Sequence, residues 1–382
     1  MTERIFDFDG HILEFDAKVL RLLETDKGYG VILDRTAFAP EGGGQLSDIG
    51  SLGDAKVIDV QAVDGELVHY IDKPVSESSF VHGSVDKDRR IRHLQNHSGE
   101  HIVAGLIYKK YGFNNVGFHL GHDDVTVDVD GVIDITALRE IEREANEIVV
   151  KNLDIYAVYP DKDELKNIFY RSKLDLSENV RIVVIDGMDA CACCAPHVKK
   201  TGEIGIIKLI TCQRYKGGTR IHMKCGFDAL DEANGEYDRA LAISNMISLP
   251  RENIADGVKK LLEDVGALKS EIYVLKKKIV EIKAESAKSN ERGNIVFVEE
   301  DMTMQDLRAL VEGVLCKAEG ICAAFSGNDN DGYSFVLGYS GENFKERTGE
   351  ILNSLSCSGG GKAPFIQGKA KCTAENIRNL LD

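Results

Sequence analysis

Two short stretches of the chain carry histidine and cysteine pairs at spacings that suit a metal ion. His97 and His101 lie four residues apart, and Cys193 and His197 repeat that separation. On a helix, side chains at i and i+4 share one face, so the first pair can direct both imidazoles at one ion. Pro196 disfavours a continuous helix between the second pair, and we expect a loop there. One thiolate and three imidazoles predict a tetrahedral zinc site with one Zn²⁺ per chain.

The first pair also fits a different metal pattern. His97, Glu100 and His101 have the H-x-x-E-H order of inverted zinc peptidases, in which the glutamate is the general base. A distant glutamate would then be the third ligand, and Glu142 or Glu144 is available. This alternative leaves the cysteine–histidine pair without a role. Glu100 is either a general base near the metal or a solvated helix residue, and we favour the second interpretation.

The composition indicates an intracellular globular protein. The 382 residues include nine cysteines, an odd number, which favours metal binding over a disulfide framework. Cys191 and Cys194 compete for the thiolate position, but the spacing to His197 favours Cys193. No apolar run approaches the roughly 18 residues of a membrane span, and the N-terminus does not resemble a signal peptide, so we expect a cytoplasmic location and no membrane. A net charge of -16 argues against nucleic-acid binding over the whole surface, although not against a local basic groove.

A glycine run near the N-terminus is a second candidate site element. Gly42, Gly43 and Gly44 precede Gln45. Consecutive glycines allow a ligand to approach the backbone closely, and their amides can meet an oxyanion. A simple hairpin turn would explain the same residues.

The elements that must position these residues suggest an α+β multidomain protein. Residues 1–88 read as a small β-barrel and residues 89–226 as an α/β zinc-containing domain with helices from about 89 to 111 and 136 to 151. Residues 227–292 read as a helical coiled-coil linker, and residues 293–382 as a C-terminal α/β domain with a glycine-rich loop at 358–361.

The linker has the sharpest periodicity in the chain. Apolar residues alternate at spacings of four and three, which predicts a coiled coil paired with residues 228–249 or with another chain. The residues of this seam are Ile254, Val258, Leu261, Val265, Leu268, Ile272, Leu275, Ile279 and Ile282.

Four motifs occur in an order that resembles a known family. They are the segment 33–45 ending in Gly-Gly-Gly-Gln, His97-x3-His101, Val116-Gly-Phe-His-Leu-Gly, and Cys193-x3-His197 followed by residues 198–205. Over residues 1–226 the chain resembles the editing region of alanyl-tRNA synthetase and its freestanding relatives, the AlaX editing proteins. The remainder resembles the synthetase's helical linker and DHH-associated C-terminal domain, so the chain is similar to a long AlaX form.

The resemblance implies hydrolysis of the ester in mischarged tRNA(Ala), mainly Ser-tRNA(Ala), with Gly-tRNA(Ala) as a second substrate. It makes His97, His101, Cys193 and His197 the zinc ligands, with the metal polarising the ester carbonyl or lowering the pKa of attacking water to about 7. Ser98 stands where the family carries a hydroxyl that helps distinguish a seryl side chain.

The resemblance further places Gln45 and the three glycines beside the site, and it implies the acceptor end of tRNA(Ala) as the partner. Basic residues near the motifs, among them Arg92, Lys199 and Lys200, are candidate phosphate contacts. The seam and the C-terminal domain indicate a homodimer.

One departure from the family pattern concerns the second metal motif. The family usually has Cys-Gly-Gly-Thr-His, whereas this chain has Cys193-Cys-Ala-Pro-His197. The ligands are retained, but two glycines and a hydroxyl are not. A non-catalytic tRNA-binding module with a structural zinc is the main alternative, and the zinc peptidase is the other.

Overall fold

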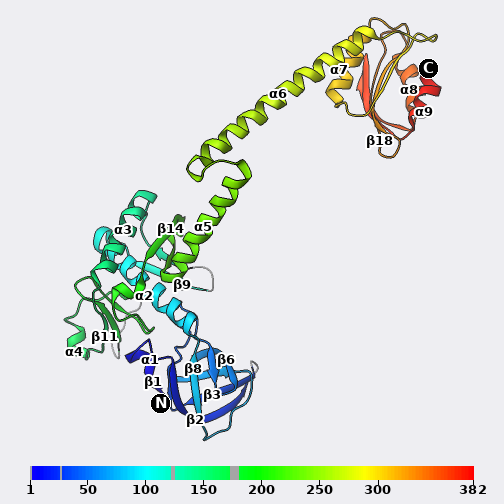
Figure 1. Ribbon diagram of the computed structural model, residues 1–382. Helices are drawn as coiled ribbons and strands as arrows, with labels where there is room; N and C mark the ends of the chain where they lie inside the picture. The colour runs from blue at the N-terminus through cyan, green and yellow to red at the C-terminus, as the bar shows by residue number, and fades with distance from the viewer. Residues whose placement is uncertain (1, 26–27, 122–124, 173–179) are drawn as a thin grey trace. The chain divides into compact units, whose positions relative to one another are not determined.

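The computed structural model describes residues 2–25, 28–121, 125–172 and 180–382. The chain divides into two compact units, Met1–Ala242 and Ile243–Asp382 (Figure 1). Both units contain helices and β-sheets, which confirms the predicted mixed α+β class. The finer division into four domains stays a prediction.

Six strands near the N-terminus form a closed barrel in the order β2-β3-β7-β6-β5-β8. Along β2, buried and exposed residues alternate, so Phe15, Ala17 and Val19 point into the barrel as a period-two strand requires. A short parallel pair, β1 with β4, and the four-residue helix α1 lie beside it. The bounds are β1 Glu3–Arg4, α1 Ile5–Phe8, β2 Glu14–Thr25, β3 Gly28–Leu33, β4 Arg35–Thr36, β5 Gly50–Leu52, β6 Ala55–Val63, β7 Glu66–Ile71 and β8 Phe80–Val85.

Helix α2 (Lys87–Tyr111) follows the last barrel strand and is the central helix of the rest of the first unit (Figure 1). Its N-terminus is capped by the Asp86 carboxylate, which accepts the Arg89 N–H at 2.8 Å. It ends at Gly112, whose φ of +71° is the left-handed conformation that stops helices. All residues from His93 to Ile107 are buried, so α2 is a core helix rather than a surface one.

Two antiparallel sheets and helix α3 (Ile135–Lys151) pack around α2. The four-stranded sheet has the order β14-β15-β10-β9, and the three-stranded sheet has the order β11-β12-β13. The remaining bounds are β9 Asn115–Leu120, β10 Val125–Val129, β11 Ile155–Val158, α4 Lys162–Leu165, β12 Ile182–Ile185, β13 Asp189–Ala192, the 3-10 helix η1 Thr201–Ile204, β14 Ile207–Tyr215, β15 Gly218–Cys225 and α5 Gly226–Ile247.

The second unit is one five-stranded sheet, in the order β16-β17-β18-β20-β19, with helices on both faces. In Figure 1, α7 lies on one side of the sheet and α8 and α9 lie on the other. Two apolar clusters reflect this arrangement, because alternate residues of β17 and β18 enter different clusters. The bounds are η2 Arg251–Asn253, α6 Ile254–Ser286, β16 Ile295–Glu299, α7 Met304–Val314, β17 Cys322–Asn328, β18 Gly332–Gly338, α8 Phe344–Ser354, β19 Cys357–Lys362, β20 Phe365–Ala370 and α9 Ala374–Leu381.

The glycine-rich segment of this unit is an edge strand, and the prediction of a loop at 358–361 is wrong. β19 pairs antiparallel with β20 along its whole length. A Cβ on Gly359 would lie 2.3 Å from the Gln367 carbonyl oxygen, and one on Gly361 would lie 2.3 Å from that of Phe365. The glycines therefore allow the two backbones to approach, and the ladder supplies the hydrogen bonds that a loop would lack.

Helix α6 is continuous over Ile254–Ser286, in agreement with the periodicity. Its seam is largely exposed, with Leu261 50%, Leu268 57% and Ile272 53% accessible. No helix within the described part of the chain is both long and apolar enough to cross a membrane.

Candidate metal centre

The structure brings the four predicted ligands together. His97 and His101 lie on α2, while Cys193 and His197 lie in the loop after β13, where Pro196 was expected to prevent a helix. The donor atoms of all four residues lie within 4.8 Å of one another. The imidazole centroids are 4.5 Å apart for His101 and His197 and 4.8 Å apart for His97 and His197.

The spacing of these atoms fits a zinc ion. Zinc holds nitrogen at about 2.0–2.1 Å and sulfur at about 2.3 Å, so tetrahedral N and S neighbours lie roughly 3.5 Å apart. Cys193 Sγ lies 3.5 Å from His97 Nε2 and 3.3 Å from His197 Nε2. The donor set therefore has the spacing of a zinc site, and these residues can hold a zinc.

Burial sets the protonation of the cluster. It raises the pKa of the Cys193 thiol to about 12, despite the opposing backbone hydrogen bond of Ala195. It also takes the pKa of His197 well below its usual value, and the nearby His101 and His97 lower it further. The imidazole of His197 is therefore neutral and ready to ligate, whereas the thiol must lose its proton when a metal binds.

Hydrogen bonds behind two ligands fix their ring orientation. Gln45 Oε1 lies 2.8 Å from His97 Nδ1, so this nitrogen donates to the amide and Nε2 is directed at Cys193. Ser98 Oγ lies 3.1 Å from His197 Nδ1 and accepts the Val198 N–H at 3.2 Å. Gln45 and Ser98 are 2% and 1% exposed, so water competes little for these bonds.

The glycine turn reaches the metal centre from the barrel. Gly42 and Gln45 exchange backbone hydrogen bonds at 3.0 and 3.1 Å, and the Gly44 carbonyl accepts the Leu120 N–H at 2.7 Å. Gly44 has φ +90°, and a Cβ there would lie 2.0 Å from the Phe118 carbonyl oxygen. Glycine is therefore required for the turn to dock on β9, which delivers Gln45 to His97.

Arg181 supports the loop that carries Cys193, a role that the metal motifs did not predict. Its guanidinium donates to the carbonyl oxygens of Cys193 and Ala195 at 2.9 and 2.8 Å, and its own carbonyl accepts the Cys193 N–H at 3.0 Å. An arginine at the start of the apolar run 180–185 was the available signal, because a charge there needs buried partners.

A second unpredicted contact ties α2 to the barrel. Arg90 and Asp48 form a fully buried ion pair in which the guanidinium also donates to Gly10 and Ala37 carbonyl oxygens at 2.8 and 2.6 Å. The Asp48 carboxylate accepts the Ala39 N–H at 2.6 Å. These bonds hold the start of the helix that carries His97 and His101 against the barrel that carries Gln45.

Glu100 is buried, so its interpretation as a solvated helix residue is wrong. It is 3% exposed, it accepts a hydrogen bond from Asn115 on β9, and its Oε2 lies 3.9 Å from His101 Nε2. The proposed third peptidase ligands lie elsewhere. Glu142 accepts the Leu209 N–H at 2.7 Å, and Glu144 pairs with Lys110 at 2.6 Å.

The three candidate phosphate contacts are exposed but paired with carboxylates. Lys199 Nζ lies 2.7 Å from Asp9, and Lys200 Nζ lies 2.6 Å from Asp154. Arg92 pairs with Asp228 and Asp231. The three cations are exposed to water, although the Asp9 and Asp228 side chains are only 27% and 14% exposed, so a phosphate can approach the cations from the solvent.

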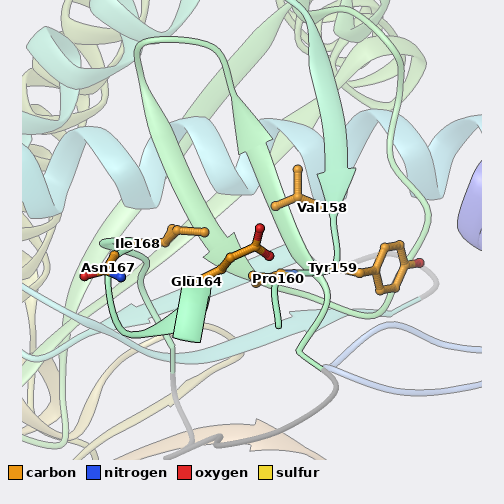
Figure 2. Close-up of a pocket in the computed structure, with 6 residues that line it drawn as sticks. All are labelled: Val158, Tyr159, Pro160, Glu164, Asn167 and Ile168. Carbon is orange, nitrogen blue, oxygen red and sulfur yellow. The ribbon is translucent and has the colours of Figure 1, made fainter. Parts of the chain in front are cut away.

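An open hollow of about 450 Å³ lies at the end of β11 (Figure 2). Tyr159 and Ile168 stand at opposite sides of it in the figure. The lining residues are Val158, Tyr159, Pro160, Glu164, Asn167 and Ile168, and none belongs to the metal cluster.

Comparisons with known proteins agree with this geometry. Residues 180–222, which include Cys193 and His197, match the threonyl and alanyl tRNA synthetase second additional domain. An alanine–tRNA ligase from Methanopyrus kandleri is 32% identical over 389 residues, covering 96% of this chain and 42% of the relative. Those from Methanococcus vannielii and Pyrococcus abyssi are 29% and 30% identical and cover 99% and 100% of this chain.

The chain spans less than half the length of the curated relatives that it matches, at 42–44% of each of these three. The resemblance predicted from the motifs is confirmed, because the similarity to archaeal alanyl-tRNA synthetases extends over the whole chain. This finding is consistent with an AlaX-type editing protein.

Proposed function

We propose that the protein is a cytoplasmic trans-editing hydrolase that deacylates mischarged tRNA(Ala), mainly Ser-tRNA(Ala) and secondarily Gly-tRNA(Ala). One observation carries the proposal: a donor cluster with the spacing of a zinc site has two of its ligands inside the matched synthetase domain. A synthetase pocket shaped for alanine cannot exclude glycine sterically and rejects an added hydroxyl poorly. A second site that hydrolyses the mischarged tRNA is therefore needed.

The side chains in and around the cluster have different roles in this proposal. His97, His101, Cys193 and His197 would hold the zinc, which when bound supplies Lewis acidity toward the ester carbonyl or water. Gln45 and Ser98 hold the His97 and His197 rings in position, with Ser98 also a candidate for recognising the seryl hydroxyl. Glu100, bonded to Asn115, places a carboxylate 3.9 Å from His101 Nε2, and the turn at Gly42–Gly44 lines the site from the barrel.

The acceptor end of tRNA(Ala) is the proposed partner. Arg92, Lys199 and Lys200 would exchange their carboxylate partners for phosphates. We further propose that the C-terminal unit is a DHH-associated domain and that the protein is a homodimer through α6 and this unit.

Deacylation of Ser-tRNA(Ala) beside Ala-tRNA(Ala) tests the function. Wild type should release serine selectively, and Cys193→Ala/His197→Ala should lose this activity by about 1,000-fold, the effect of about 4 kcal/mol in the barrier. Cys194→Ala is the matched control, since this neighbouring thiol is exposed and lies outside the cluster. No serine release by a zinc-loaded wild type would contradict the proposal.

A non-catalytic tRNA-binding module is the second candidate. The observation that favours it is the complete set of four protein ligands, which is typical of structural zinc sites. In that case the wild type would bind tRNA(Ala) without hydrolysing its ester. The double variant would have a lower free energy of unfolding, and there would be no deacylation rate to lose.

A further inference from the structure

The segment that precedes the barrel lies against the loop that carries two of the four metal ligands. We call residues 7–11 the N-terminal clamp and residues 193–200 the ligand loop. Gly10 in the clamp is buried. A Cβ on Gly10 would lie 3.1 Å from the His197 carbonyl oxygen and 3.1 Å from Pro196 Cβ. The clamp backbone therefore packs directly on the main chain of a predicted ligand, at a distance that leaves little room for a side chain.

The same glycine is held from another side by the helix that carries the other two ligands. Its carbonyl oxygen accepts a hydrogen bond from the buried Arg90 guanidinium at 2.8 Å. A Cβ on Gly10 would also lie 2.9 Å from Leu94 Cδ2, and Leu94 precedes His97 by three residues on α2. Gly10 is thus packed between the helix and the loop that supply two ligands each.

Side-chain pairs join the clamp to the chain that follows the ligand pair of the loop. Asp9 Oδ2 lies 2.7 Å from Lys199 Nζ, and His11 Nε2 lies 2.7 Å from Glu203 Oε2. The His11 N–H also donates to Asp9 Oδ1 at 2.9 Å, which keeps the two clamp residues together. These contacts tie the end of the ligand loop to the clamp.

The start of the ligand loop is held through Arg181. Its guanidinium donates to the Cys193 and Ala195 carbonyl oxygens at 2.9 and 2.8 Å, and to the Asp7 carbonyl oxygen at 3.4 Å. The clamp therefore contacts the ligand loop at its start through Arg181, at its centre through Gly10, and at its end through the two side-chain pairs.

We infer that the N-terminal clamp is a positioning element of the metal centre, and that Gly10 sets the place of His197 relative to the histidines on α2. Zinc–ligand distances vary by only about 0.2 Å, so a small displacement of the ligand loop weakens the site. A side chain at Gly10 displaces this loop, because Arg90 holds the clamp itself in place. The inference rests on the zinc site of the proposed function and does not depend on the deacylase activity.

The zinc affinity of the full chain tests this role, measured without tRNA by competition with a chromogenic chelator. Gly10→Ala and Gly10→Val add one and three carbons at the contact, so affinity should fall progressively, by about 10- to 100-fold for valine. Gly30→Val is the matched control. A Cβ on Gly30 would lie 2.9 Å from Val68, and its next neighbours, Thr25 and Leu23, also belong to barrel strands. Because this site is independent of the ligand loop, zinc affinity should stay within about twofold of wild type.

Cobalt substitution separates positioning from fold stability. The visible spectrum of Co²⁺ depends on the arrangement of its ligands. At saturating Co²⁺ the spectrum of Gly10→Val should differ from that of the wild type, whereas the Gly30→Val spectrum should match it. A lower free energy of unfolding alone would alter neither spectrum of the folded protein.

A double variant keeps the inference testable if Gly10→Val does not fold. Asp9→Asn/His11→Ala removes the pairs at the end of the ligand loop, and the two side chains are 27% and 38% exposed, so the fold should tolerate the change. Zinc affinity should fall about threefold. His82→Ala/Glu14→Gln removes an exposed pair on the barrel, 2.9 Å apart, and should leave zinc affinity unaltered.

The other outcomes overturn the inference or the proposal beneath it. An unchanged zinc affinity in Gly10→Val would overturn the positioning role, and so would equal losses in Gly10→Val and Gly30→Val. If Gly10→Val does not fold, an unchanged affinity in Asp9→Asn/His11→Ala has the same meaning. A wild type that binds no zinc would overturn the metal centre together with the role of the clamp. Zinc-loaded wild type that releases no serine would overturn the proposed function alone.

Discussion

The metal centre and the α6 seam both include side chains at helical spacing, yet within the described residues other segments of the chain cover only the first. His97 and His101 are 3% and 2% exposed, and segments from the barrel and the loop after β13 meet them. The seam residues are about half exposed along the middle of α6. Helical periodicity therefore identifies an apolar or ligating face of a helix, and burial then shows which of these faces the described part of the chain covers.

The largest effect that would sharpen this contrast is loss of the proposed dimer without loss of the metal centre. Leu268→Glu places a carboxylate at the centre of the seam, and dimer affinity should fall by about 1,000-fold or more because the charge is buried without a partner. Zinc content and the rate of serine release should stay within about twofold of wild type. A comparable fall in zinc content, measured by atomic absorption on the monomer, would show that the site is not complete in one chain.

The next effect concerns the contact that anchors α2 to the barrel. Arg90→Met leaves the buried Asp48 carboxylate without its cation, so the first unit should lose about 3–5 kcal/mol in free energy of unfolding. Urea unfolding followed by circular dichroism measures this loss. Arg89→Met is the control: the Arg89 side chain donates a hydrogen bond to the Ser47 carbonyl oxygen at 2.9 Å, and the loss of this bond should cost about 1 kcal/mol. Equal losses from the two variants would contradict the anchoring role.

The smallest effects concern the bonds behind the ligands. Gln45→Ala and Ser98→Ala should each weaken zinc affinity about 10- to 100-fold, since each removes the group that fixes a ligand imidazole. Competition with a chromogenic chelator measures the affinity, and Gln61→Ala on the barrel is the matched control. If Ser98→Ala leaves zinc affinity intact but changes the ratio of serine to alanine release, the hydroxyl contacts substrate instead.

The sequence predicted the parts of the site that lie within one element. The i, i+4 pair on α2 and the loop at Pro196 follow from local geometry. The continuous helix that carries the seam follows from the spacing of its apolar residues. Arg181, Asn115 and the Arg90–Asp48 pair were missed because their partners come from distant segments. The two errors have the same origin: β9 buries Glu100, and β20 turns the glycine segment at Cys357–Lys362 into a strand.

Serine release as a function of restored zinc tests the central claim most directly. Chelator-treated protein should be inactive toward Ser-tRNA(Ala), and activity should rise linearly with added Zn²⁺ and level off at one ion per chain. Full activity in protein shown to contain no zinc, or full zinc loading without serine release, would contradict the account.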